Sequence, residues 1–259
     1  MKAVVEHITN WLNAYLEKCG QAGFVVGVSG GVDSALTATL CAKSGKSTIL
    51  VNMPIRQSTQ EYNRASEQIK ALESLYENVE VLEVPLSETF SSFESSLPNQ
   101  IFSNPLAMAN SRSRLRMMTL YAIAQANKSL VVGTGNKVED FGIGFFTKYG
   151  DGGVDVSPIA DLKKTAVFKL AKFVGVVDSI LQAKPTDGLW EDGRSDEDQI
   201  GAQYHELEWA MDNIQGNEQA FTERQKEVMK IYKKFHFANK HKMEPIPVCV
   251  IPENLQTLL

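Results

Sequence analysis

A short glycine-rich segment near the start of the chain carries the residue types that bind phosphate. It follows an apolar run and reads Gly27-Val28-Ser29-Gly30-Gly31-Val32-Asp33-Ser34. Gly30 and Gly31 allow positive φ values and a close approach to a ligand, so successive backbone N–H groups can converge on an anion at a helix N-terminus. Ser29 and Ser34 add hydroxyl donors. Because the Asp33 carboxylate repels phosphate oxygens unless a cation lies between them, the segment predicts a pyrophosphate site that also uses Mg²⁺.

Other glycine motifs compete with this interpretation. A P-loop requires Lys directly after its glycines, and the first Lys here is Lys43, well inside the next predicted helix. The dinucleotide fingerprint fails at its third glycine. Residues 27–31 formally satisfy the Gly-x-Ser-x-Gly pattern of α/β-hydrolases, but residues 1–23 are patterned mostly as a helix and leave no room for the oxyanion-hole strand that precedes the serine. A hydrolase and a tight turn without a ligand remain the less favoured alternatives.

Length and composition limit the function further. At 259 residues we expect a single α/β domain over residues 1–259. The net charge of −5 argues against a broad basic surface, so we expect no nucleic-acid partner. Three scattered cysteines favour a reducing compartment. Because the sequence has neither a signal-peptide pattern nor a membrane-spanning apolar run, we expect a cytoplasmic protein that does not enter a membrane.

The surrounding sequence alternates between strand and helix patterns. It predicts strands over residues 24–28, 47–53, 79–84 and 129–134. It predicts helices over residues 4–16, 34–43, 59–75, 105–125 and 217–242. Such alternation is typical of an α/β fold with a doubly wound parallel sheet, helices on both faces and ligands at the carboxyl ends of the strands. The polar strand ends at Ser29, Asn52 and Thr134 should therefore share one edge.

Two irregular segments break this alternation. Residues 135–161 contain Glu139, Asp140 and a run of glycines mixed with aromatic residues. Long loops in compact domains are usually functional, so we expect this loop to contribute to the site; a disordered insertion is the alternative. Residues 184–194 form the second segment, and the Ser195 and Asp198 pair after it predicts a capped helix start.

Residues 29–34 match the Ser-Gly-Gly-x-Asp-Ser signature of the N-type ATP pyrophosphatases, which cleave ATP between the α- and β-phosphates. Further motifs narrow the resemblance: Gly-Thr-Gly-Asn-Lys-Val-Glu at 133–139, Gly-Phe-Phe-Thr-Lys-Tyr-Gly-Asp-Gly-Gly at 144–153, Lys-Pro-Thr at 184–186 and His-Lys at 241–242. From about residue 27 to residue 247 the chain resembles the ammonia-dependent NAD synthetases. The resemblance implies an adenine nucleotide alpha hydrolase-like fold. It also implies that deamido-NAD, ATP and ammonia yield NAD, AMP and pyrophosphate through an adenylated carboxylate.

The same resemblance implies a role for individual residues. The implied Mg²⁺ ligands are Asp33 and Glu139. The implied ATP contacts are Gly27, Val28, Ser29, Gly30, Gly31, Val32, Asp33, Ser34, Thr134, Lys164 and Thr186, and the catalytic residues among them are Asp33, Lys164 and Thr186. The implied deamido-NAD contacts are Arg114, Lys148, Asp155, His241 and Lys242. Three of these five are cationic, which suits a ligand with a pyrophosphate and a nicotinate carboxylate.

The sequence does not decide the roles of some neighbouring residues. The chain holds one residue more between Glu139 and Gly144 than some family members, which leaves the register of residues 140–143 undecided. Lys163 neighbours Lys164, and either could contact phosphate. Because no amidase segment with a catalytic Cys accompanies the motifs, ammonia rather than glutamine is the expected nitrogen donor. The family also implies a homodimer.

Two rival functions remain. One is another ligase of the superfamily that amidates or modifies a nucleotide, including tRNA-modifying enzymes, and the other is a non-catalytic nucleotide sensor. A net charge of −5 argues against a tRNA substrate. A sensor needs neither two carboxylates for one metal nor a glycine-rich loop, so turnover is the favoured interpretation.

Overall fold

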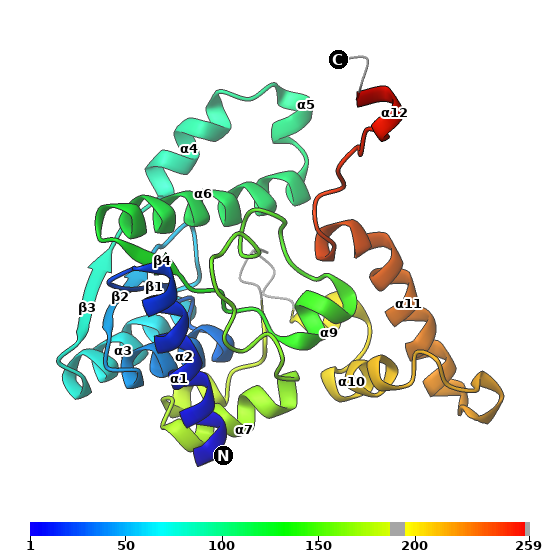
Figure 1. Cartoon of the computed structure of the whole chain (residues 1–259), viewed down its shortest axis with the longest axis horizontal. Helices are drawn as coiled ribbons and strands as arrows, with labels where there is room; N and C mark the ends of the chain where they lie inside the picture. The colour runs from blue at the N-terminus through cyan, green and yellow to red at the C-terminus, as the bar shows by residue number, and fades with distance from the viewer. Residues whose placement is uncertain (187–194, 257–259) are drawn as a thin grey trace.

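The computed structural model describes residues 1–186 and 195–256. Four parallel strands form one sheet in the order β3-β2-β1-β4 (Figure 1). The strands are β1 (Gly23–Gly27), β2 (Ser47–Asn52), β3 (Val79–Glu83) and β4 (Ser129–Val131). In the register of the sheet, Val25 of β1 lies between Ile49 of β2 and Val131 of β4. The prediction of an α/β fold with a parallel sheet is confirmed.

Helices cover both faces of this sheet (Figure 1). The first face is covered by α1 (Lys2–Cys19), α2 (Val32–Lys43), α3 (Thr59–Leu75), α7 (Lys164–Val174) and α8 (Asp178–Leu181). The opposite face is covered by α4 (Ser87–Ser95) and α6 (Pro105–Ala126), with α5 (Asn99–Phe102) between them in the chain. Side chains alternate along β1, so Phe24 and Val26 pack in the first layer and Val25 packs in the second.

A third apolar cluster lies beyond the carboxyl end of the sheet. It joins the π-helical turn η1 (Val138–Ile143) to α10 (Tyr204–Asp212) and α11 (Glu223–Met243). The short helices α9 (Asp196–Ile200) and η2 (Glu218–Ala220) precede α10 and α11, and α12 (Glu253–Gln256) follows. Because η1 follows β4 directly in the chain, this cluster fixes the loop that leaves the sheet beside the cavity described below.

The local signals of the sequence are largely confirmed. Asn104 caps α6 by accepting a hydrogen bond from Ala107 N, and Ser195 with Asp198 forms the capping box of α9. The expected strand over residues 129–134 is shorter, because the chain leaves the sheet after Val131 and only a single bridge joins Val132 to Val156.

Part of the segment over residues 184–194 cannot be compared, since residues 187–194 lie outside the described part of the chain. Among the helices that the structure describes, none has the length and apolarity needed to cross a bilayer.

Candidate active site

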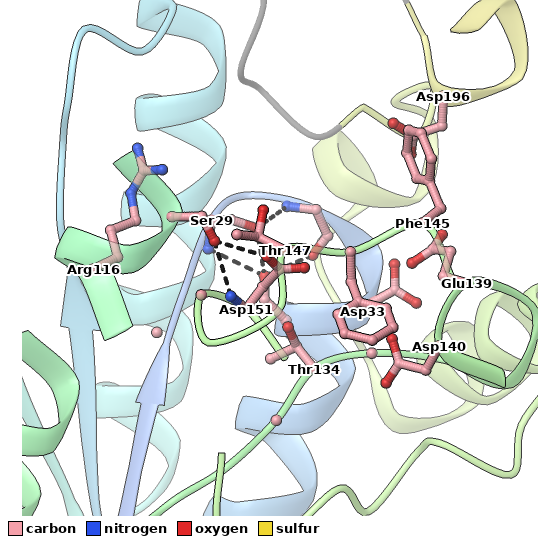
Figure 2. Close-up of a pocket in the computed structure, with 18 of the residues that line it drawn as sticks. Ser29, Asp33, Arg116, Thr134, Glu139, Asp140, Phe145, Thr147, Asp151 and Asp196 are labelled. Carbon is pink, nitrogen blue, oxygen red and sulfur yellow. Dashed lines mark hydrogen bonds between the residues drawn. The ribbon is translucent and has the colours of Figure 1, made fainter. Parts of the chain in front are cut away.

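A cavity of about 710 Å³ lies at the carboxyl ends of β1 and β4. β1 and β4 are neighbours in the sheet, and the strand order reverses between them. Open α/β sheets bind ligands at such a point. Figure 2 shows Ser29, Asp33 and Thr134 around it. Sixteen of the expected site residues line this cavity: Gly27, Val28, Ser29, Gly30, Gly31, Val32, Asp33, Ser34, Arg114, Thr134, Glu139, Lys148, Lys164, Thr186, His241 and Lys242.

The glycine-rich turn connects β1 to α2, and its two glycines serve different purposes. Gly30 has a φ of 85°, and a Cβ atom placed on it would lie 2.5 Å from the Glu61 carbonyl oxygen of α3. Both the backbone conformation and the close approach therefore require glycine. Gly31 is different: its φ is −94°, and it is the N-cap residue of α2. Gly31 does not use the positive φ that glycine allows, because as the N-cap residue it has an extended backbone.

The hydroxyl groups of the turn bond within the turn itself. Ser34 Oγ donates to Gly31 O at 3.0 Å and accepts from Ser29 N at 3.1 Å. Ser29 Oγ lies 3.0 Å from Ser34 Oγ and accepts from Gly31 N. Within the described residues, Gly31 caps α2 without a side-chain acceptor, so the N–H groups of the first helical turn can bind an anion.

Three charged side chains meet beside this turn. Lys164 Nζ lies 2.6 Å from Asp33 Oδ2 and 2.9 Å from Glu139 Oε1. Lys164 is only 3% exposed although it begins α7. Asn136 completes the arrangement: its amide donates to Asp33 Oδ1 at 3.1 Å, and its oxygen accepts from the backbone N–H groups of Val138 and Glu139. The side chains come from α2, η1 and α7, which the sheet edge brings together.

The electrostatics of this cluster follow from burial and pairing. Burial alone would lower the pKa of Lys164, but the two carboxylates outweigh it and raise the pKa, so the ammonium stays charged. Burial raises the pKa of Asp33 despite the attraction of Lys164. For Glu139, Lys164 and the Tyr204 hydroxyl overcome the effect of burial and lower the pKa. The cluster thus holds a fixed cation between two carboxyl groups of unequal acidity.

Asp33 and Glu139 fit a magnesium ion. Both carboxyl groups approach the same ammonium, so their oxygen atoms converge on one small volume beside the turn. Mg²⁺ is bound in proteins through oxygen ligands, commonly one or two carboxylates together with substrate phosphates. No group of three or more metal-binding side chains occurs among the described residues.

The two neighbouring lysines, Lys163 and Lys164, have different surroundings. Lys163 Nζ lies 2.5 Å from Asp212 Oδ2, and both side chains are partly exposed. Lys164 instead lines the cavity, and Lys163 does not. Of the two neighbouring lysines, Lys164 is the one whose side chain faces the cavity and the Asp33 carboxylate.

Asp140 lies against Gly135, the residue after Thr134. A Cβ atom on Gly135 would lie 2.0 Å from Asp140 Oδ2, so glycine there makes room for this carboxyl group. Burial, reinforced by the negative charges of Glu139, Asp151 and Asp33, raises the pKa of Asp140 to about 8. Asp140 also lines the cavity (Figure 2). Glu139, and not Asp140, is the residue that shares Lys164 with Asp33.

The expected dinucleotide contacts gather where the loop over residues 144–154 meets the end of α11. Arg114 Nε donates to the Lys148 carbonyl at 3.3 Å, Lys148 Nζ donates to the His241 carbonyl at 2.7 Å, and Lys242 Nζ donates to the Phe146 carbonyl at 2.6 Å. These bonds link α6, the loop and α11 around the cavity wall. The loop also packs on α6 through Ser113, whose hydroxyl donates to Asp151 Oδ1 at 2.7 Å.

Asp155 is the expected site residue that the structure does not bring to the cavity. Its carboxyl group accepts hydrogen bonds from the Tyr121 hydroxyl at 3.0 Å and from Val131 N at 2.8 Å. These bonds tie the end of the loop to β4 and α6. In the single chain, Asp155 therefore supports the sheet edge.

Sequence reasoning missed two residues of the site. Arg116 of α6 lines the cavity, and burial, followed by the charge of the nearby Arg112, lowers its pKa to about 10 (Figure 2). Tyr204, only 4% exposed, donates its hydroxyl hydrogen bond to Glu139 Oε1, and Lys164 Nζ lies 4.7 Å from the centre of its ring. The Tyr204 hydroxyl also lies 3.1 Å from Asp196 Oδ2. No local pattern marks the contacts of Tyr204 with Lys164 and Glu139, which are 40 and 65 residues away in the chain.

The chain is similar to known proteins in sequence and in structure. Two curated NH(3)-dependent NAD(+) synthetases are similar to the chain: that of Mesoplasma florum is 37% identical over 210 residues, covering 80% of this chain and 83% of the relative, and that of Archaeoglobus fulgidus is 35% identical over 254 residues, covering 97% and 98%. The structure of an NMN synthetase from Francisella tularensis superposes with a TM-score of 0.83 at 33% identity, covering 97% of this chain and 98% of that one.

The NH3-dependent NAD synthetase of Campylobacter jejuni has a TM-score of 0.78 at 22% identity, covering 96% of this chain and 99% of that one, and shares the fold. The NAD synthase family model matches residues 4–245, which include the glycine-rich turn, the carboxylate and lysine cluster and the loop that meets α11. The chain belongs to the NAD synthase family.

Proposed function

We propose that this protein is a ligase that uses ATP to amidate nicotinic acid adenine dinucleotide with ammonia, giving NAD, AMP and pyrophosphate. The observation that carries the proposal is the ammonium of Lys164 held between Asp33 and Glu139, beside a glycine-rich turn in the same cavity. The curated relatives that cover most of the chain carry the name of this activity, which supports the substrate class.

The chemistry explains why the site needs these parts. A carboxylate is a poor electrophile, because its charge repels nucleophiles and oxide is a poor leaving group. Transfer of AMP from ATP to the nicotinate carboxylate forms a mixed anhydride and releases pyrophosphate, and attack by ammonia then forms the amide and expels AMP. The protein needs no covalent nucleophile for this sequence; it has to orient the reactants, neutralise charge and exclude water.

Each part of the cavity has a place in this sequence. The N–H groups at the start of α2 face the departing pyrophosphate. Lys164 supplies a fixed positive charge for the α-phosphate of the transferred AMP. Arg114, Lys148 and Lys242 supply cationic groups for the dinucleotide. Asp33 and Glu139 would hold Mg²⁺, which would neutralise phosphate charge.

A mixture of purified protein, deamido-NAD, ATP, Mg²⁺ and ammonium tests the proposal, with NAD and AMP measured by mass spectrometry. We expect equal amounts of NAD and AMP. The rate should follow the concentration of neutral NH₃ and so rise with pH until a protein group titrates. Glutamine at equal total nitrogen should be inert. Formation of NAD from glutamine at the same rate, with contaminating amidase excluded, would overturn the assignment of the nitrogen donor.

The mononucleotide is a second candidate substrate. The observation that favours it is the NMN synthetase from Francisella tularensis, which matches this chain over nearly its whole length at 33% identity. By this second proposal, the same cavity would amidate nicotinic acid mononucleotide in place of the dinucleotide. Measuring kcat/KM for nicotinic acid mononucleotide and for deamido-NAD in the same preparation separates the two: a higher value for the dinucleotide supports the first proposal, and a higher value for the mononucleotide replaces it.

We further propose a cytoplasmic homodimer that acts on these small molecules as one domain per chain and binds neither nucleic acid nor membrane. Leu106 and Met118 on α6 support an interface, since they are large apolar side chains with exposed fractions of 58% and 60%. Cys19, Cys41 and Cys249 are free thiols, which suits a reducing compartment. Analytical ultracentrifugation of the wild type and of Met118→Glu tests the interface, with a dimer expected for the former and a monomer for the latter.

A further inference from the structure

One face of α10 contacts the start of α7 at three successive turns. Tyr204, Glu208 and Asp212 are spaced by four residues, so they lie on the same side of the helix. Their partners are consecutive: Asp212 pairs with Lys163, the Tyr204 ring lies under Lys164, and Glu208 binds Thr165. A helix that lies outside the sheet layers thus contacts the residue that bridges Asp33 and Glu139.

The N-terminus of α7 is unusual because it begins with two lysines. A helix N-terminus carries a partial positive charge and unpaired N–H groups, so cations there are unfavourable. Lys163 is the N-cap residue, and its side chain forms no capping hydrogen bond. Glu208 supplies the missing cap from 43 positions along the chain: its Oε1 accepts from Thr165 N and its Oε2 accepts from Thr165 Oγ1, both at 2.8 Å.

Glu208 is therefore placed to fix the backbone position of Lys164, from which the lysine side chain extends. It is 9% exposed, and both of its carboxylate oxygens bind Thr165, the residue directly after Lys164. The carboxylate also offsets the repulsion between the helix N-terminus and the lysine ammonium.

Tyr204 contacts the ammonium end of the Lys164 side chain. Its ring faces the Lys164 ammonium at 4.7 Å, and its hydroxyl donates to Glu139 Oε1. One side chain thus contacts both members of the Lys164 and Glu139 pair. Neither Tyr204 nor Glu208 lines the cavity, so both act through the residues that do.

We propose that Tyr204 and Glu208 are positioning residues of the ATP site, which hold the Lys164 ammonium and the Glu139 carboxylate in the geometry that phosphate and metal require. The inference rests on the proposed function for the identity of the ligand, ATP. The contacts of Tyr204 and Glu208 are the evidence for how Lys164 and Glu139 are held. Partners that orient a ligating carboxylate or a catalytic charge affect affinity or rate by about 10–100-fold when removed.

Four variants test the inference. Glu208→Ala removes both acceptors at the start of α7, whereas Glu208→Gln keeps an oxygen for Thr165 N and an amide that can donate to the Thr165 hydroxyl. Tyr204→Phe removes only the hydroxyl and keeps the ring under Lys164. Asp212→Asn is the matched control, because it changes a partly exposed ion pair on the same helix face that does not touch Lys164.

Two readouts separate positioning from a general loss of structure. The first is the Kd of a non-hydrolysable ATP analogue with Mg²⁺, measured by titration calorimetry without turnover. The second is the separation of kcat from the KM for deamido-NAD. We expect Glu208→Ala and Tyr204→Phe to raise the analogue Kd or lower kcat by about 10–100-fold, with the KM for deamido-NAD within about twofold of wild type. Glu208→Gln should restore most of the loss, and Asp212→Asn should stay within about twofold.

The outcomes are distinguishable. If the wild type forms no NAD but binds the ATP analogue, the proposed function fails, and the analogue Kd of the variants still decides the positioning roles. If Glu208→Ala does not fold, Glu208→Gln and Tyr204→Phe decide them. Wild-type kcat and wild-type analogue Kd in folded Tyr204→Phe and Glu208→Ala would overturn the inference, as would an Asp212→Asn variant as impaired as Glu208→Ala.

Discussion

The glycine-rich turn and the carboxylate and lysine cluster lie side by side in one cavity but are built in different ways. In the turn, the hydroxyl and amide hydrogen bonds join Ser29, Gly31 and Ser34, which are no more than five residues apart. In the cluster, Lys164 reaches Asp33 across 131 residues and Glu139 across 25 residues. The turn is a local structure, whereas the cluster exists only once the whole sheet edge has assembled.

The turn and the cluster should respond differently to substitution. A local turn depends on its own backbone conformation, so a single wrong residue strains it wherever the rest of the chain lies. An assembled cluster depends on charge balance, because removing one partner leaves a buried charge without compensation. Asp33 belongs to both regions, since it lies in the first turn of α2 and binds Lys164.

The Asp33→Asn substitution should have the largest effect on activity. It keeps the size of the side chain but removes the charge that the turn and the cluster share, next to the departing pyrophosphate. We expect kcat to fall by at least about 10²–10³-fold, the range found when one preorganised electrostatic group is removed from an active site. Steady-state assays with Mg²⁺ measure the fall, and circular dichroism checks that the fold is kept. Wild-type turnover that no longer depends on metal would contradict the role of Asp33.

The Glu139→Gln and Asp140→Asn pair tests which neighbouring carboxylate belongs to the cluster. Glu139 shares Lys164 with Asp33, so Glu139→Gln should lower kcat by about 10²-fold or more. Asp140 has no ion pair among the described residues, and its raised pKa of about 8 shows that burial favours its neutral form. Asp140→Asn should therefore lower kcat by less than about tenfold. The opposite order would assign the metal to Asp140 and shift the register of the loop by one residue.

The Gly30→Ala and Gly31→Ala pair tests the turn alone. Alanine at position 30 has to adopt a φ of 85° and lies too close to the Glu61 carbonyl, so we expect a loss of at least about 2 kcal/mol in the free energy of unfolding. Alanine at position 31 meets nothing nearer than Ser29 Oγ at 3.5 Å and has an ordinary φ, so the loss should stay near about 1 kcal/mol. Urea titration of both variants measures the difference; equal losses would mean that the turn does not depend on the conformation of Gly30.

The same difference explains what could be predicted from the sequence. The strands, the turn and the cap at Asn104 depend on neighbouring residues, and periodicity and motif spacing located them. The grouping of Asp33 with Lys164 came from a family resemblance, because their separation of 131 residues carries no periodic signal. Tyr204, Arg116 and Glu208 were missed for the same reason: a tyrosine, an arginine and a glutamate on helices look like ordinary core or surface residues until the tertiary contacts are known.

The smallest expected effect concerns the border of the cluster, where Asp140 is buried beside other acids. Its pKa in the folded protein is raised from 3.8 to about 8, by burial and then by the charges of Glu139, Asp151 and Asp33. Between these two values the folded state binds a proton that the unfolded state has released, so the stabilisation is lost as pH rises through about 8. We expect the free energy of unfolding to fall by roughly 1 kcal/mol between pH 7 and pH 9 from this group. Asp140→Asn, which stays neutral, should remove that part of the pH dependence, so urea titrations of both proteins across this range compare their slopes. Parallel curves would mean that Asp140 is already ionised in the folded protein at pH 7. The carboxyl group of Asp140 would then add a negative charge beside Glu139 and Asp33 despite its burial.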